Sequence, residues 1–172
     1  METQDRGQNR GQDRGLMLPA LDPRGVPARA GSSYPEPFAG QVAARSKRAL
    51  GDALGLRNFG VNLVEMPPGA LSSMRHWHGR QDEFEFVLEG ELTLVTEIGE
   101  QVLGPGMAAG FPAGAADGHH HVNRTDKPAV YLEVGDRAPG DDVVYPDVDL
   151  ALPHNPGAHR PRPFTHKDGT PY

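Results

Sequence analysis

Apolar and polar residues alternate along the middle of the chain, in short segments separated by Gly and Pro. The segment 58–66, NFGVNLVEM, alternates and ends at Pro67-Pro68-Gly69, which is typical of a strand followed by a turn. Further strands are predicted at 72–78, 83–88, 91–97, 101–103, 108–111, 119–123 and 130–134. Short strands at this spacing predict an all-β sandwich or a small closed barrel.

The flanking segments show much less alternation. The first residues repeat QDRG-like tetrads, which predict a disordered polar tail, and Met17 is an alternative start of the native protein. The segment 45–56 favours one helical turn, and 145–152 favours an edge strand whose prolines limit pairing. We therefore predict a polar tail, an N-terminal arm, a barrel and a C-terminal extension packed on the barrel: 1–16, 17–57, 58–137 and 138–172.

The composition agrees with many short strands and disfavours several classes of partner. The chain has 22 Gly and 17 Pro, and only 6% of its residues are aromatic, which favours turns over long helices. A formal net charge of −6 argues against a nucleic-acid partner. The chain lacks Cys, and no apolar run approaches the ~18 residues of a membrane span. We expect a cytoplasmic protein without membrane contact.

Ionisable residues occupy positions that face one side of the predicted strands. With a period of two, His76 and His78 share a face, as do Glu83 and Glu85 of the next segment. The pair His-x-His on a strand is suited to chelating one ion. A further imidazole is available in the GHHHVN segment, where parity places His119, His121 and Asn123 on one face and His120 on the other.

These residues follow the order of the two motifs of the cupin superfamily, G(X)5HXH(X)3-4E(X)6G and G(X)5PXG(X)2H(X)3N. His76, His78, Glu83 and Gly90 match the first motif, and Gly106, Pro112, Gly114, His119 and Asn123 resemble the second. Two turns are longer than the motifs: six residues separate Gly69 from His76, and four separate Gly114 from His119.

The chain is similar to single-domain bacterial cupins described as cupins or as proposed sugar phosphate isomerases. The resemblance implies a jelly-roll barrel (a double-stranded β-helix) that binds one divalent metal ion. Its four ligands would be His76, His78, Glu83 and His119, with the neighbours His120 and His121 as alternatives to His119. Imidazole and carboxylate ligands suit Fe, Mn, Zn, Ni or Co; we favour Fe(II) or Mn(II), and Zn follows closely.

Two further inward positions carry groups that can move protons. Glu85 and His121 are predicted catalytic residues, because a carboxylate and an imidazole beside a metal ion are the parts of metal-assisted proton transfer. The alternatives are a salt bridge from Glu85 to an arginine such as Arg80 and a hydrogen bond from His121 to a metal ligand.

These features predict a metal-dependent enzyme that acts on a small oxygen-rich molecule by isomerisation, decarboxylation or dioxygen chemistry. The alternatives are a non-catalytic cupin that binds a small ligand as a sensor or carrier, and a barrel that the metal only stabilises. No inward Arg or Lys cluster is identified, which favours a neutral or carboxylate-bearing substrate. The alternative is a phosphate bound by an arginine at a strand end: Arg75, Arg80 or Arg124.

The remaining aromatic positions are predicted to be structural. Trp77 favours a packing or dimer contact over substrate stacking. Phe84, Phe86 and Leu88 face away from the barrel interior and need a cover, which favours a homodimer. His154, His159 and His166 lack ligand spacing, and we expect them to be exposed to solvent.

Overall fold

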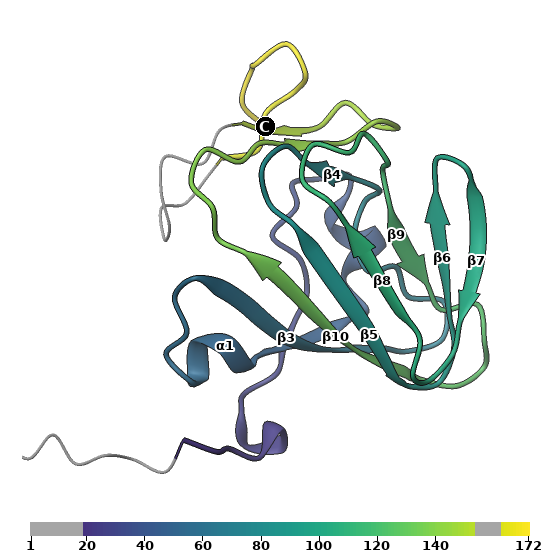
Figure 1. The fold of residues 1–172 in the computed structure, drawn as a ribbon. Coiled ribbons are helices and arrows are strands. Elements are labelled where there is room, and N and C mark those ends of the chain that lie inside the picture. Colours follow the sequence, from purple (N-terminus) through teal and green to yellow (C-terminus); the bar gives the residue numbers. More distant parts are fainter. Residues whose placement is uncertain (1–18, 154–162) are drawn as a thin grey trace, which may run out of the picture.

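A computed structural model of the chain describes residues 19–153 and 163–172. The predicted polar tail 1–16, the alternative start Met17, and the two tail histidines His154 and His159 lie outside the described residues. Within them, short antiparallel strands dominate and helices are few (Figure 1). The all-β prediction is therefore confirmed.

One sheet of six strands forms the larger layer of the molecule. Its strand order is β1-β2-β3-β10-β5-β8, and all its pairings are antiparallel. The bounds are β1 Arg29–Ala30, β2 Ser46–Ala49, β3 Phe59–Met66, β10 Ala129–Asp136, β5 Glu83–Glu89 and β8 Ala108–Phe111. The short helix α1, Leu50–Ala53, follows β2, and the 3-10 turns Pro23–Gly25 and Ala39–Val42 lie in the arm before it.

Two smaller sheets complete the jelly-roll sandwich. One has the order β7-β6-β9, with β6 Leu92–Thr96, β7 Gly99–Leu103 and β9 His120–Val122, and it stands opposite the large sheet in Figure 1. The other has the order β12-β11-β4, with β4 Trp77–His78, β11 Val143–Val144 and β12 Ala151–Leu152. The C-terminal segment is thus joined to the strand that carries His78.

The alternation of the sequence produces the core between the six-stranded sheet and the sheet β7-β6-β9. Inward residues of β3 and β10, such as Val64, Met66 and Tyr131, are fully buried against Leu92 and Leu103 of the facing sheet. Burial of such side chains contributes about 1.5–3 kcal/mol each. A second cluster seals the arm against the C-terminal segment: Phe38, Val143, Tyr145 and Leu150.

The structure differs from the predicted elements at two places. The helical turn in 45–56 exists as α1, but residues 46–49 before it form the strand β2, which pairs with β3. The predicted strand 72–78 is regular only at Trp77–His78, and before it His76 forms a single bridge to His119. In both cases the partner strand, distant in sequence, decides the local conformation.

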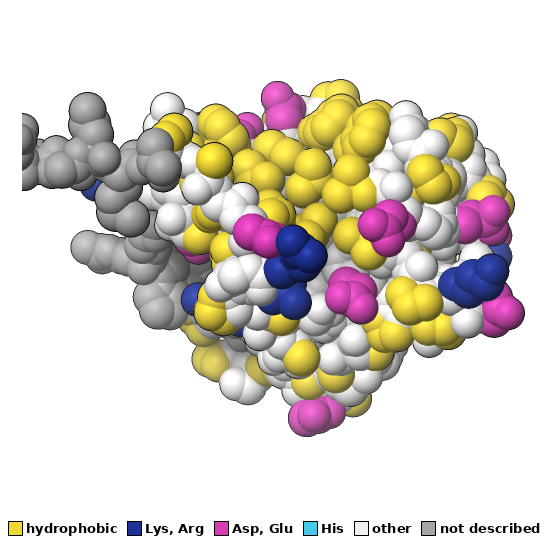
Figure 2. All heavy atoms as spheres, turned by 90° about the horizontal axis from the view of Figure 1, so that it is seen from below, with side chains coloured by type: hydrophobic (Ala, Val, Ile, Leu, Met, Phe, Trp, Pro, Cys, Tyr) yellow, Lys and Arg dark blue, Asp and Glu magenta, His cyan; other side chains and the backbone are white. Residues whose placement is uncertain are grey.

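The outer face of the large sheet is apolar. Leu132 lies opposite Leu63 and Phe86, and Val134 lies opposite Val61 and Phe84. The side chains of Phe84 and Leu88 are 46% and 40% exposed. A space-filling view from below also shows hydrophobic side chains gathered in one area of the surface (Figure 2). Among the described residues, none of the helices is both long and apolar enough to span a bilayer.

Candidate metal centre

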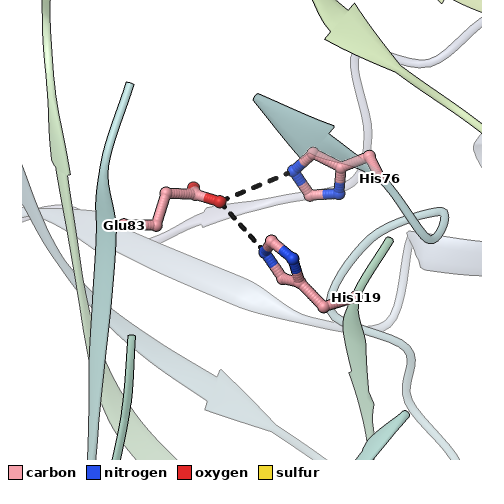
Figure 3. Close-up of side chains that lie close together, drawn as sticks. All are labelled: His76, Glu83 and His119. Carbon is pink, nitrogen blue, oxygen red and sulfur yellow. Dashed lines mark hydrogen bonds and ion pairs between the residues drawn. The ribbon is translucent and has the colours of Figure 1, made fainter. Parts of the chain in front are cut away.

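Three irregularly paired segments bring the predicted ligands together. His76 and His119 are bridge partners, His78 belongs to β4, and Glu83 is the first residue of β5. The Nε2 atoms of His119, His78 and His76 lie 3.1, 3.6 and 4.0 Å from Oε2 of Glu83. Figure 3 shows His76 and His119 both directed at this oxygen. The potential ligand atoms of His76, Glu83 and His119 all lie within 4.8 Å of one another.

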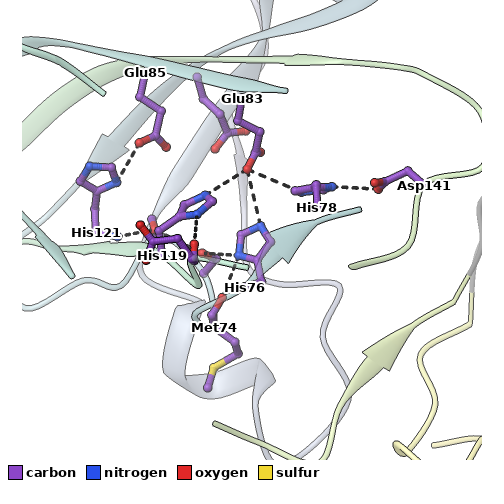
Figure 4. Close-up of polar contacts among 12 residues, drawn as sticks. Met74, His76, His78, Glu83, Glu85, His119, His121 and Asp141 are labelled. Carbon is purple, nitrogen blue, oxygen red and sulfur yellow. Dashed lines mark hydrogen bonds and ion pairs between the residues drawn. The ribbon is translucent and has the colours of Figure 1, made fainter. Parts of the chain in front are cut away.

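The second nitrogen of each imidazole faces a hydrogen-bond acceptor. The Nδ1 atoms of His76 and His119 lie 3.0 and 3.1 Å from the carbonyl oxygens of Met74 and Asp117. Nδ1 of His78 lies 2.8 Å from Oδ2 of Asp141, a fully buried carboxylate (Figure 4). An acceptor beside Nδ1 favours the tautomer that carries its proton there, which leaves the Nε2 lone pair free to bind a metal.

The charge of Glu83 and the lone pairs around it favour the binding of a cation. Burial raises the pKa of Glu83, but the imidazoles of His119, His78 and His76 lower it by more, to about 2, so the carboxylate is ionised. Burial lowers the pKa of His76 to about 4, so its imidazole is neutral at pH 7. With its Nδ1 facing the carbonyl oxygen of Met74, neutral His76 directs its Nε2 lone pair at the ionised carboxylate of Glu83. A divalent cation among them would turn this repulsion into ligation, and the residues present fit such an ion.

Glu85 and His121 form a second polar cluster beside the first. Nδ1 of His121 lies 3.2 Å from Oε2 of Glu85, but the approach lacks hydrogen-bond geometry, and both atoms are buried without a partner, as is the hydroxyl of Tyr131. Burial raises the pKa of Glu85, with Glu133 and Glu83 adding to the effect, and burial lowers the pKa of His121 to about 4. Glu85 faces His121 in Figure 4, while Arg80 donates its backbone N–H to Asp141.

The neighbours of His119 have other roles. Nδ1 of His120 lies 3.1 Å from the carbonyl oxygen of Ser73, away from the Glu83 cluster. Asn123 is fully buried, and its amide donates to the carbonyl oxygens of Met66 and Lys127. Asn123 therefore fixes the loop after β9, whereas His120 lies outside the group of potential ligands.

Two cavities meet at the cluster. One has a volume of about 60 Å³ and is lined by Trp77 and Phe111 together with His78, Glu83 and His119. The ring of Phe111 stacks on His119 with centroids 3.5 Å apart. Trp77, predicted to be a packing residue, thus borders a cavity next to the site. The other cavity has a volume of about 120 Å³, and its walls include His76, Glu83, Glu85 and His119.

Sequence reasoning missed several residues of the site. Arg45, Lys47 and Glu133 line the larger cavity, so the expectation that no Arg or Lys faces inward was wrong. The sequence signal was present, because Arg45 and Lys47 are two residues apart, but the segment was interpreted as helical. Asp141 lies in the Pro- and Asp-rich tail, where no pattern distinguishes it from its neighbours.

The profile of the family described as Cupin domain matches residues 62–135. Among solved structures, a protein from Silicibacter pomeroyi named as a sugar phosphate isomerase from a cupin superfamily is 47% identical. The alignment covers 90% of this chain and 96% of that one, with a TM-score of 0.84. Comparison with curated proteins gave no significant match.

Two more distant structures share the fold. A proposed sugar phosphate isomerase from Acidithiobacillus ferrooxidans is 32% identical over 74% of this chain and 80% of that one, with a TM-score of 0.65. A polyketide cyclase from Streptomyces resistomycificus is 23% identical over 70% of this chain and 80% of that one, with a TM-score of 0.56. At this lower identity the likeness extends to the fold alone.

Proposed function

Because the chain belongs to the cupin superfamily, we propose that it is a metal-dependent enzyme that acts on a small oxygen-rich molecule. The protein ligands of its single divalent ion would be three imidazoles and one carboxylate: His76, His78, Glu83 and His119. The observation that carries this proposal is the convergence of three Nε2 atoms on Oε2 of Glu83, while each Nδ1 faces an acceptor.

The four protein ligands would leave coordination positions open for oxygen atoms of the substrate. A divalent ion would supply Lewis-acid chemistry there, by polarising a carbonyl or hydroxyl group. Fe(II) or Mn(II) is the favoured ion, because mixed imidazole and carboxylate ligation suits both. The chain itself provides the enclosure. Phe111 covers one face of His119, and the small cavities limit how much water reaches the centre.

Glu85 is the proposed proton-transfer residue. It lines the same cavity as Glu83, His76 and His119, so a substrate bound there would contact its carboxyl group. His121 is 1% exposed and lies behind Glu85, so we assign it the role of positioning that carboxyl group. Among isomerisation, decarboxylation and dioxygenation, this arrangement favours a reaction with proton transfer at a carbon next to a carbonyl.

The names of two similar structures support the choice of an isomerisation. The two most identical structures described above are named as sugar phosphate isomerases, one of them as a proposal. Isomerisation between an aldose and a ketose moves a proton between adjacent carbons, which is the chemistry that a metal ion and a nearby carboxyl group promote.

Elemental analysis of protein purified without a histidine tag or added metal tests the proposal. We expect near-stoichiometric iron or manganese in the wild type and its loss in His76→Ala and Glu83→Ala. His120→Ala is the matched control, because His120 is adjacent to His119 but directed elsewhere, and it should retain the metal. Protein that holds no metal, and takes up none when supplied with Fe(II), Mn(II) or Zn(II), would contradict the proposal.

A further inference from the structure

Two basic residues, Arg45 and Lys47, line the larger cavity together with the proposed metal ligands, and from this we infer an anion-binding subsite built around Arg45. The inference rests on the proposed function and narrows it: the substrate carries a carboxylate or phosphate group that Arg45 binds while another part of the molecule reaches the metal centre.

The register of β2 directs Arg45 inward. Lys47 lies opposite Val64 of β3, a fully buried core residue, whereas Arg48 lies opposite Leu63, which belongs to the outer face of the sheet. Side chains two residues apart on an extended chain share a face, so Arg45 is on the same side as Lys47. Both line the cavity that also contains His76 and Glu83.

The charge of Lys47 is already compensated. Its Nζ donates to both carboxylate oxygens of Glu133 at 2.8 and 2.7 Å, and the amide of Asn62 donates to the same carboxylate at 2.9 Å. The two side chains are mostly buried and form a closed pair. Lys47 therefore already has its counter-ion within the chain and is not the anion-binding residue of the subsite.

Arg45 has no such partner. Among the described residues it forms no ion pair; its Nη1 donates to the carbonyl oxygen of Val42 at 2.8 Å, and its Nε is buried without a hydrogen-bond partner. A half-buried guanidinium without a counter-ion is costly, and a carboxylate or phosphate satisfies two of its N–H groups at once.

The charges around the cavity also favour an anionic ligand. Glu83 would neutralise one of the two charges of a divalent ion, and Glu133 neutralises Lys47. The remaining charge of the ion and that of Arg45 would both attract an anion into this cavity of about 120 Å³, where Glu85 is the remaining carboxyl group of the lining. Drug-sized ligands occupy roughly 300–1,000 Å³, so a small anion fits this space better than a large one.

A groove lined by residues of the arm, β2 and β3 shares the same two basic residues. It has a volume of about 510 Å³, and Arg45 and Lys47 line both hollows, together with Arg29 and Arg137 in the groove. Asp52 pairs with Arg137 there, which leaves Arg29 and Arg45 as positive charges along the approach. Such a surface raises the local concentration of an anionic substrate.

Calorimetric titration with inorganic phosphate, pyruvate and neutral glycerol tests the subsite on manganese-loaded protein. We expect one of the anions, and not glycerol, to bind the wild type, and Arg45→Gln to weaken that binding roughly 10- to 100-fold while the metal content stays unchanged. The tighter of the two anions identifies the group as a phosphate or a carboxylate.

Two further variants make the test specific. Arg45→Lys keeps the charge but loses the planar pair of donors, so its affinity should lie between those of the wild type and Arg45→Gln. Arg57→Gln removes an exposed arginine of the same region and should leave binding unchanged.

The outcomes separate the subsite from the metal centre. Equal affinities of Arg45→Gln and the wild type, or no binding of either anion to metal-loaded protein, would overturn the subsite and leave the metal centre standing. Protein that takes up no metal but binds an anion through Arg45 would support the subsite and overturn the proposed function instead.

Discussion

At the scale of single residues, the three histidines of the proposed metal centre differ in what accepts the hydrogen bond of Nδ1. Backbone carbonyl groups hold Nδ1 of His76 and His119, and the carboxylate of Asp141 holds that of His78. A charged acceptor makes an imidazole a stronger ligand than a carbonyl group does. His78 lies outside the group formed by His76, Glu83 and His119. Its carboxylate partner makes it the strongest proposed ligand among the three histidines.

Glu85 offers a sharp test of chemistry at this scale. We expect Glu85→Gln to lower turnover by about 10²- to 10⁴-fold with unchanged metal content, because the amide keeps the size of the side chain but cannot transfer a proton. Solvent deuterium exchange and oxygen uptake with small hydroxy and keto acids measure the loss. Glu89→Gln, an exposed change on the same strand, is the control. An unaffected rate in Glu85→Gln would remove its role in proton transfer.

At the scale of elements, β2 joins the arm to the barrel through a buried ion pair. Burial by itself raises the pKa of Glu133, but the charge and hydrogen bond of Lys47 outweigh burial, so the pKa lies below its ordinary value of 4.5. A pKa that folding lowers stabilises the protein fully above the unfolded-state value, and the contribution is lost as the pH falls through the folded-state value.

The variant Lys47→Met should therefore be destabilised by about 3–5 kcal/mol at pH 7, because it leaves the Glu133 carboxylate buried without its cation. The difference from the wild type should shrink as the pH falls, because burial without Lys47 raises the pKa of Glu133 in the variant, so its carboxyl group is protonated while that of the wild type is still ionised. Urea unfolding at several pH values measures both effects. The double variant Lys47→Met/Glu133→Gln should recover most of the loss, and a deficit independent of pH would contradict this account.

At the scale of the whole molecule, the described residues leave part of the outer face of the large sheet exposed, including Phe84 and Leu88. Three adjacent strands present apolar side chains there, including Val61, Leu132 and Phe84. Monomeric proteins rarely leave a wide apolar patch exposed. The prediction of a homodimer follows from this face, and the proposed metal centre lies on the opposite, inward side of the same strands.

Sedimentation velocity tests the homodimer. We expect the wild type to sediment as a dimer and Phe84→Lys to sediment as a monomer, since a charge in the middle of an apolar interface costs several kcal/mol. Ile98→Lys alters a 95% exposed residue in the turn between β6 and β7, and it should leave the dimer intact. A monomeric wild type at micromolar concentration would disprove the prediction.

The sequence by itself determined the fold class, and it predicted the inward positions of the proposed metal ligands. Alternation with a period of two depends only on which residues are apolar, so it located β3, β5 and β10 and the shared faces of His76 with His78 and of Glu83 with Glu85. The spacing of the four proposed ligands is compatible with binding one ion. They lie on elements whose pairing is restricted by the turns between them.

Only the tertiary structure decided which residues from distant segments complete the site. Arg45 enters because β2 pairs with β3, and Asp141 enters because the C-terminal segment pairs with β4. Neither pairing was predicted, because the segment that contains β2 was interpreted as helical and the C-terminal segment is far from β4 in the chain. The charge that faces the metal centre is therefore a property of the assembled sheet.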